Sequence, residues 1–377
     1  MSESLPAPPP PAPPSAAARR ARELGLAVGD LPTGAHNALT DVPGVRVGHT
    51  TLVHPPRVHS GVTAIVPDGV GPGSPLPAGV FTGNGYGKLL GTTQLAELGA
   101  LETPVLLTST LSAFRVADAL VGWVLERPEG AGAQSLNPVV GECNDGLLSD
   151  IRSRPVRAEH VRAALDTACG GPVPEGCVGA GTGTTALGFK AGVGTSSRRV
   201  PLAGREVTLG VLVQANFGGT LRVSGRTVTP ADVGVPTTDP RPSHADPHPN
   251  PHPGQGPEAG SCMIVAATDA PLDARQLTRV ARRAVYGLAR AGAAYGHGSG
   301  DYGIAFGTRP LGTPAGPAVL PDDRLDPLFV AVLDAVEEAV LNALLTATTT
   351  TGPYGHTRHP LPAAPLLALL RRARIPG

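Results

Sequence analysis

Hydrophobic residues are most regularly spaced in the last third of the chain. From Asp273 to Ala291 they recur at i, i+3, i+4 and i+7, which predicts an amphipathic helix, and Leu328 to Leu345 predicts a second long helix. Cys262 to Thr268 and Tyr302 to Phe306 are short hydrophobic runs of the kind typical of buried strands. We therefore expect strand, helix, strand and helix in this order.

The first two thirds of the chain mix strand and helix patterns without a regular alternation. Strands are predicted for Val62 to Val66, Pro104 to Ser109 and Thr208 to Asn216, and a turn at Pro43-Gly44 leads into another that ends near His49. Helices are predicted for Ala113 to Leu125 and Val156 to Thr167. Two glycine-rich stretches are predicted as loops: Phe81 to Lys88, which opens a helix through Leu98, and Gly179 to Thr185. This mixture favours an α+β fold or a layered sandwich over a barrel of alternating strands and helices.

Two segments have no pattern that would bury a core. Residues 1 to 18 consist mainly of Pro and Ala, and we expect disorder there, with a short helix from Ala18 to Leu26 and the organised domain from about Asn37 to residue 377. Residues 235 to 260 contain eight prolines, which predicts a flexible, exposed linker. At Ser261 the sequence changes abruptly to a core strand.

Composition excludes several classes of protein. The 30 Lys and Arg residues balance 30 Asp and Glu residues, which argues against a protein that binds nucleic acid by neutralising phosphates. No hydrophobic run reaches the roughly 18 residues needed to span a bilayer, and no secretory signal pattern begins the sequence, so we expect a cytoplasmic protein without membrane partners. The four cysteines form no C-x-x-C pair and are expected to be reduced thiols.

Common catalytic and ligand-binding motifs are missing or incomplete. There is no G-x-S-x-G, because His297 stands where the first glycine would precede Ser299, and there is no H-E-x-x-H. The segment Gly181 to Ala186 fits G-x-G-x-x-A but has no convincing strand before it. His244, His248 and His252 stand near Asp246, but the prolines between them forbid a helix, so we interpret them as part of a solvated linker. No metal or organic cofactor is implied.

The junction between Gly260 and Ser261 suggests a specific chemistry. If that peptide bond were cut, Ser261 would carry both a hydroxyl and a free α-amine, whose pKa is ordinarily near 7.7 and which can therefore act as a base near neutral pH. A Ser or Thr nucleophile activated by its own N-terminal amine is a known hydrolase arrangement. Glycine before it lacks a Cβ and leaves its carbonyl open to attack.

Several stretches together resemble one family, the L-aminopeptidase/D-amidase-esterases and β-aminopeptidases, also called DmpA/BapA-like peptidases or the S58 (P1) family. The similarity extends from about Asn37 to Gly307. It is carried by Leu39 to His49, Gly83 to Gly85, Pro138 to Gly146, Gly179 to Gly183, Val213 to Gly218, Gly260-Ser261, Ala267 to Leu272 and Gly298 to Asp301.

The resemblance implies a fold, a maturation and a set of roles. The fold is an αββα sandwich layered like that of Ntn hydrolases but connected differently. The precursor cuts itself into residues 1–260 and 261–377, and pairs of these subunits assemble into homo-oligomers. Ser261 matches the nucleophile, Ser299 and Asp301 match the supporting pair, and Asn216 matches the oxyanion-hole amide. Two departures affect substrate preference: some relatives have Glu at position 301, and no tyrosine stands near Asn144 to Leu147.

The predicted activity is that of a self-processing N-terminal-serine aminopeptidase or amidase. It would act on short peptides, amino-acid amides or esters with L-, D- or β-residues. Asn84, Glu142 and Asp145 are candidates to bind the substrate amine, and the sequence does not decide among them. Two alternatives stay open: transfer to an amine, as in the ornithine acetyltransferases with a similar layered fold, and an uncleaved, non-catalytic binding relative.

Overall fold

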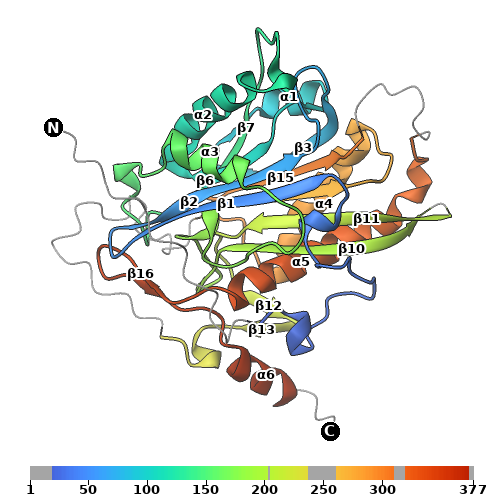
Figure 1. The fold of residues 1–377 in the computed structure, drawn as a ribbon. Coiled ribbons are helices and arrows are strands. Elements are labelled where there is room, and N and C mark those ends of the chain that lie inside the picture. The colour runs from blue at the N-terminus through green and yellow to red at the C-terminus, as the bar shows by residue number, and fades with distance from the viewer. Residues whose placement is uncertain (1–18, 203, 237–259, 310–318, 373–377) are drawn as a thin grey trace, which may run out of the picture.

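The computed structural model describes residues 19–202, 204–236, 260–309 and 319–372. Two large mixed sheets dominate the fold (Figure 1). The first sheet has the strand order β1-β2-β6-β7-β4, with β1 at Val45–His54, β2 at Val58–Pro67, β6 at Val105–Ser109, β7 at Val139–Cys143 and β4 at Leu89–Leu90. The neighbours β6 and β7 run parallel, and helix α2 lies between them in the sequence.

The second sheet has the strand order β10-β11-β14-β15-β3-β5. Its strands are β10 at Val193–Leu202, β11 at Arg205–Gln214, β14 at Cys262–Thr268, β15 at Gly300–Gly307, β3 at Leu76–Gly85 and β5 at Ala100–Leu101. Here β14 and β15 are the parallel pair, while β11 and β3 flank them in antiparallel orientation. The end of β11, the start of β14, the start of β15 and the end of β3 therefore meet at one edge of the sheet.

The main helices cover the outer faces of the two sheets. Helices α2 (Ala113–Leu125) and α3 (Ala158–Asp166) pack on the first sheet, and α4 (Ala274–Ala291) and α5 (Asp326–Leu345) pack on the second (Figure 1). The remaining helices are α1 (Thr92–Glu97) and the C-terminal α6 (Ala363–Arg372), and short strand pairs join β8 (Thr185–Ala186) to β9 (Phe189–Lys190), β12 (Leu221–Val223) to β13 (Arg226–Val228) and β16 (Thr350–Thr351) to β17 (Thr357–Arg358). Among the described residues, none of these helices is both long and apolar enough to cross a membrane.

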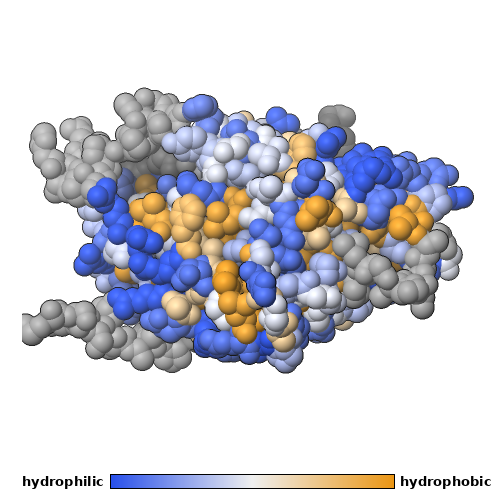
Figure 2. Space-filling view, turned by 90° about the horizontal axis from the view of Figure 1, so that it is seen from above, coloured by the Kyte–Doolittle hydropathy of each residue, from blue (hydrophilic) through white to orange (hydrophobic). Residues whose placement is uncertain are grey.

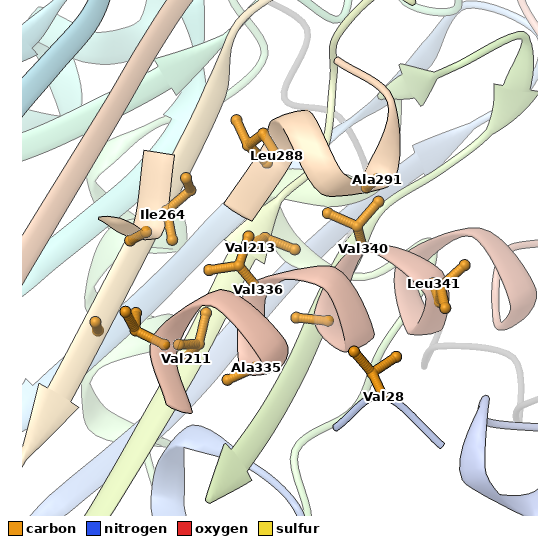
Figure 3. Packing of buried hydrophobic residues seen from close by; sticks show 14 of the residues in the cluster. Val28, Val211, Val213, Ile264, Leu288, Ala291, Ala335, Val336, Val340 and Leu341 are labelled. Carbon is orange, nitrogen blue, oxygen red and sulfur yellow. The ribbon is translucent and has the colours of Figure 1, made fainter. Parts of the chain in front are cut away.

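Three clusters of buried hydrophobic side chains fill the spaces around the sheets. Alternate residues of one strand enter different clusters, because successive side chains point to opposite faces. Ile264 packs with α4 and α5, whereas its neighbour Val265 packs in the cluster that both sheets share. The close view in Figure 3 shows Ile264 near Val336 and Leu288, with Val28 of the N-terminal segment on the other side of α5.

Most of the predicted elements are confirmed. The strand from Cys262 to Thr268 and the helix from Ala113 to Leu125 have the predicted bounds. The helix predicted from Asp273 begins at Ala274, because the Asp273 side chain accepts a hydrogen bond from Gln276 N as its N-cap. All four cysteines lie among the described residues and carry free thiols.

The glycine-rich loop predicted from Phe81 to Lys88 is wrong in its first half. Residues up to Gly85 continue β3 and pair with β15, and no helix begins until Thr92. The glycines here serve close packing: a Cβ on Gly83 would lie 2.4 Å from the Val285 side chain of α4. The small residues in this stretch therefore let the strand β3 and the helix α4 pack directly against each other.

The packed fold begins before Asn37, where the sequence predicted the domain to start. The predicted helix from Ala18 to Leu26 is reduced to a 3-10 turn at Arg22–Leu24, because Gly25 adopts a left-handed conformation (φ 76°) and ends it. Ala21 is fully buried, and its N–H donates to the Asn342 side chain of α5. Residues 19–36 thus belong to the packed fold. Residues 1–18 and 237–259, including the three linker histidines, lie outside the described residues.

Candidate active site

Ser261 lies immediately before β14, at the edge where four strand ends meet. It is 4% exposed, and its Oγ accepts a hydrogen bond from the backbone N–H of Gly300 at 3.3 Å. Its carbonyl oxygen accepts from the Cys143 thiol at 2.9 Å, so the end of β7 in the first sheet also contacts it. Both sheets therefore fix this serine.

Ser299 and Asp301 are hydrogen-bonded to each other beside Ser261. The hydroxyl of Ser299 donates to Asp301 Oδ1 at 2.9 Å, and the parallel register places Asp301 opposite Cys262. Burial raises the pKa of Asp301 to about 6, although the bond from Ser299 acts to lower it. The other carboxylate oxygen, Oδ2, is buried and has no hydrogen-bond partner among the described residues. The carboxyl is thus suited to exchange a proton near neutral pH.

Asn216 lies two residues after β11 and has its side-chain amide fixed at both ends. Its Oδ1 accepts from Thr185 N at 3.0 Å, and its Nδ2 donates to the carbonyl oxygen of Asn144 at 3.1 Å. A Cβ placed on Gly260 would lie 2.6 Å from this Nδ2. The amide therefore lies directly against the junction of Gly260 and Ser261, with one N–H already committed to Asn144.

Glu142 is a buried carboxylate at the end of β7. It accepts hydrogen bonds from the backbone N–H of Lys88 at 2.8 Å and from the Thr110 hydroxyl, and the Lys88 ammonium lies 3.8 Å from Oε1. Burial raises the pKa of Glu142 despite these partners. A Cβ on Gly87 would lie 3.1 Å from Gly300 Cα and 3.5 Å from Glu142 Oε1, which places Glu142 near the residue that holds the Ser261 hydroxyl.

The two other predicted amine-binding residues are already engaged. Asn84 pairs with Asp301 across β3 and β15, and its Nδ2 donates to Gly296 O at 2.6 Å, which ties β3 to the loop before Ser299. Asp145 is 2% exposed and accepts from the hydroxyls of Ser60 at 2.7 Å and Ser109 at 2.8 Å. The structure thus brings Ser261, Ser299, Asp301, Asn216 and Glu142 together, while Asn84 and Asp145 brace the surrounding backbone.

Sequence reasoning missed three residues of this site. Cys143 holds the Ser261 carbonyl, Thr110 holds Glu142, and the Tyr302 hydroxyl donates to Gly85 O at 3.2 Å and to Gly87 O at 3.0 Å. Tyr302 and Cys143 stand directly beside Asp301 and Glu142 in the sequence, which was the available signal. Among the described residues, no group of three or more His, Cys, Asp or Glu side chains is arranged to hold a metal ion.

The chain matches known proteins over nearly its whole length. The model of peptidase family S58 matches residues 37–358. The chain belongs to peptidase family S58. Its membership makes the protein a hydrolase of the serine aminopeptidase class.

Three relatives illustrate the S58 family. A β-peptidyl aminopeptidase, BapA, of Sphingosinicella microcystinivorans is 41% identical over 94% of this chain and 92% of its own length. The solved structure of a β-aminopeptidase of a Burkholderia species has a TM-score of 0.80 and 39% identity, covering 95% of this chain and all of that one. The L-aminopeptidase D-Ala-esterase/amidase of Ochrobactrum anthropi has a TM-score of 0.79 and 37% identity, covering 94% and 98%, and is described as a variant of the Ntn hydrolase fold.

Proposed function

We propose that the protein is a self-processing N-terminal-serine aminopeptidase that releases N-terminal residues from short peptides, amides or esters. One observation carries the proposal. Ser261, the residue directly after Gly260, has its hydroxyl held by the N–H of Gly300, and the Asn216 amide lies against the peptide bond between Gly260 and Ser261. A nucleophile, the bond it would cut and a hydrogen-bond donor are therefore assembled at one place.

In the precursor, Ser261 Oγ attacks the Gly260 carbonyl carbon and loses its proton. The tetrahedral intermediate collapses as the Ser261 nitrogen leaves, takes up a proton and becomes a free amine, and Gly260 becomes esterified to Oγ. Water then hydrolyses this ester and releases the two subunits. The second N–H of Asn216 Nδ2 is the donor for the oxyanion, because the first is held by Asn144 O.

In the mature enzyme the same oxygen attacks the carbonyl of the substrate. The α-amine of Ser261 accepts the Oγ proton, and the Ser299–Asp301 pair relays protons beside it. Burial raises the pKa of Asp301 to about 6, so this carboxyl changes its protonation state close to neutral pH. Water completes the cycle by hydrolysing the acyl-enzyme.

We infer that Glu142 binds the free amine of the substrate. It lies near Gly300, whose N–H holds the Ser261 hydroxyl, and each of its carboxylate oxygens can accept a further hydrogen bond beside those from Lys88 and Thr110. Asp145 is instead bonded to Ser60 and Ser109 of the first sheet. The relatives named as β-aminopeptidases and as an L-aminopeptidase make β- and L-residues the substrates to test first.

We also propose a layered architecture and an oligomeric assembly for this protein. The three core clusters support a four-layer αββα sandwich, with helices outside two facing sheets. Assembly into homo-oligomers of αβ pairs is supported by large hydrophobic side chains left exposed, among them Leu98, Phe114 and Leu125. Figure 2 shows separate hydrophobic patches among hydrophilic ones on the face seen from above.

The proposal is tested by hydrolysis of β- and L-aminoacyl anilides. The purified protein is expected to release the aniline, and Ser261→Ala is expected to release none above background. Glu142→Gln should raise KM more strongly than it lowers kcat. If Ser261→Ala is as active as the unchanged protein, the proposed function is wrong. Hydroxylamine added as an acceptor separates hydrolysis from acyl transfer.

A further inference from the structure

Cys143 at the end of β7 and the two residues after it contact the catalytic machinery or the core beneath it. Cys143 donates to the carbonyl of Ser261, and the carbonyl of Asn144 accepts from Asn216 Nδ2. Asp145 follows with its side chain buried and bonded to two serines. The position of this short turn therefore fixes the Nδ2 end of the Asn216 amide, while Thr185 N fixes its Oδ1 end.

The Asp145 carboxylate ties the turn to two strands of the first sheet. Ser60 belongs to β2 and Ser109 ends β6, and each hydroxyl donates to a different carboxylate oxygen. The packing is tight, because a Cβ on Gly183 would lie 2.8 Å from Asp145 Cβ. The Asp145 carbonyl also accepts from Leu148 N at 3.1 Å, so both the side chain and the backbone of this residue are fixed.

We propose that Asp145 is a positioning residue of the oxyanion hole, acting through Asn144 and Asn216. The inference rests on the proposed function, because it assigns Asn216 to the oxyanion. The two serine bonds to the carboxylate fix the residue that follows Asn144, and so keep the Asn144 carbonyl where it accepts one N–H of Asn216 and leaves the other for the reacting carbonyl.

A carboxylate suits this role better than its amide. Both oxygens of an ionised carboxylate accept hydrogen bonds, whereas the NH₂ of an asparagine would face a serine hydroxyl as a second donor. Burial raises the pKa of Asp145 to about 6 while the two serine hydroxyls act to lower it, so the group is ionised at pH 8. Asp145→Asn keeps the shape of the side chain but forces one of the two serine hydroxyls to accept a hydrogen bond where it donates one in the unchanged protein.

A double-mutant cycle with Asn216 tests the proposal. Asp145→Asn and Asn216→Ala should each lower kcat about 100-fold, the effect of losing one oxyanion donor, with KM within about threefold. The double variant should lie within about threefold of Asn216→Ala, because Asp145 has nothing left to position. Where a variant matures too slowly for a kcat, the rate of self-cleavage on denaturing gels replaces it and should follow the same pattern.

Glu175→Gln is the matched control. Glu175 is also a buried carboxylate, but it pairs with Arg20 at 2.6 Å and accepts from Thr195 N at 2.7 Å, neither of which belongs to the site. This variant should change the melting temperature and leave kcat unchanged. Ser60→Ala and Ser109→Ala serve if Asp145→Asn does not fold, and each should lower kcat about tenfold, also without further loss in Asn216→Ala.

The outcomes separate two failures. Independent, multiplying losses in the double variant, or an unchanged kcat in a folded Asp145→Asn, would overturn the positioning role while Ser261-dependent activity still stands. Activity that persists in Ser261→Ala would overturn the proposed function and the positioning role with it.

Discussion

At the scale of single residues, Asp301 combines a position in the proposed site with an unfavourable environment. Burial raises its pKa from 3.8 to about 6, which means that the folded protein binds this proton more tightly than the unfolded chain. The ionised carboxylate therefore lowers the free energy of unfolding above pH 6. That cost disappears as the pH falls toward 4.

Asp301→Asn should accordingly separate activity from stability. The amide is neutral at every pH, so it should raise the free energy of unfolding at pH 8 by up to about 3 kcal/mol, with no gain at pH 4. Activity at pH 8 should fall by about 100-fold or more, as for other acid–base groups. Stability is measured by urea unfolding in a Ser261→Ala background, so that both proteins are single chains. The same difference in free energy of unfolding between the two proteins at pH 8 and at pH 4 would contradict the assigned environment.

Gly260 is restricted by its contact with Asn216. A Cβ there would lie 2.1 Å from the Asn216 carbonyl oxygen, which is backbone and cannot turn aside. Gly260→Ala should displace the scissile carbonyl and slow self-cleavage by about 100-fold or more. Gly122→Ala is the control, since no atom lies within 4 Å of a Cβ placed there, and it should mature at the normal rate. Time courses on denaturing gels measure both, and normal maturation of Gly260→Ala would refute this geometry.

At the scale of elements, a buried ionic cluster joins the N-terminal segment, β10 and α5. Glu338 of α5 is fully buried and pairs with Arg198 at 2.7 Å and with Arg22 at 2.9 Å, while Asn37 donates to it at 2.6 Å. Arg198 is itself buried, so the removal of Glu338 would leave its charge unpaired in the core.

Glu338→Ala should therefore lower the free energy of unfolding by about 3–5 kcal/mol. The matched control is Glu206→Ala, which breaks an exposed pair with Arg199 and should cost about 0–1 kcal/mol. Urea unfolding in the Ser261→Ala background compares them. Similar losses for the two variants would show that the buried cluster contributes little to stability.

The same cluster explains why some elements escaped prediction. Strand β10 buries Thr195, Ser196, Ser197 and Arg198, because hydroxyls and Glu338 satisfy polar groups that a hydrophobicity pattern treats as exposed. The strand at Cys262–Thr268 was predictable because its first six residues are buried and hydrophobic. The Ser261 and Asp301 positions followed from motifs, whereas the roles of Cys143, Thr110 and Tyr302 depend on contacts between strands distant in the sequence.

At the scale of the whole molecule, the proposed cut does not separate two bodies. The strands β14 and β15 follow the cut, yet they lie in the middle of the second sheet, between β11 and β3 from before it. Backbone hydrogen bonds on both sides, and the contact of α5 with Val28 seen in Figure 3, hold the later part of the chain in place.

The two subunits should consequently stay together after maturation. They are expected to elute as one species from a sizing column in native buffer and to separate only in denaturant. Elution of a free smaller subunit under native conditions would show that the sheet does not persist after cleavage.

The most direct test of the account is the N-terminal sequence and intact mass of the purified protein. We predict two chains, the smaller beginning Ser-Cys-Met-Ile-Val at Ser261, and a single uncut chain for Ser261→Ala. An active protein that keeps the bond between Gly260 and Ser261 intact would contradict the central claim.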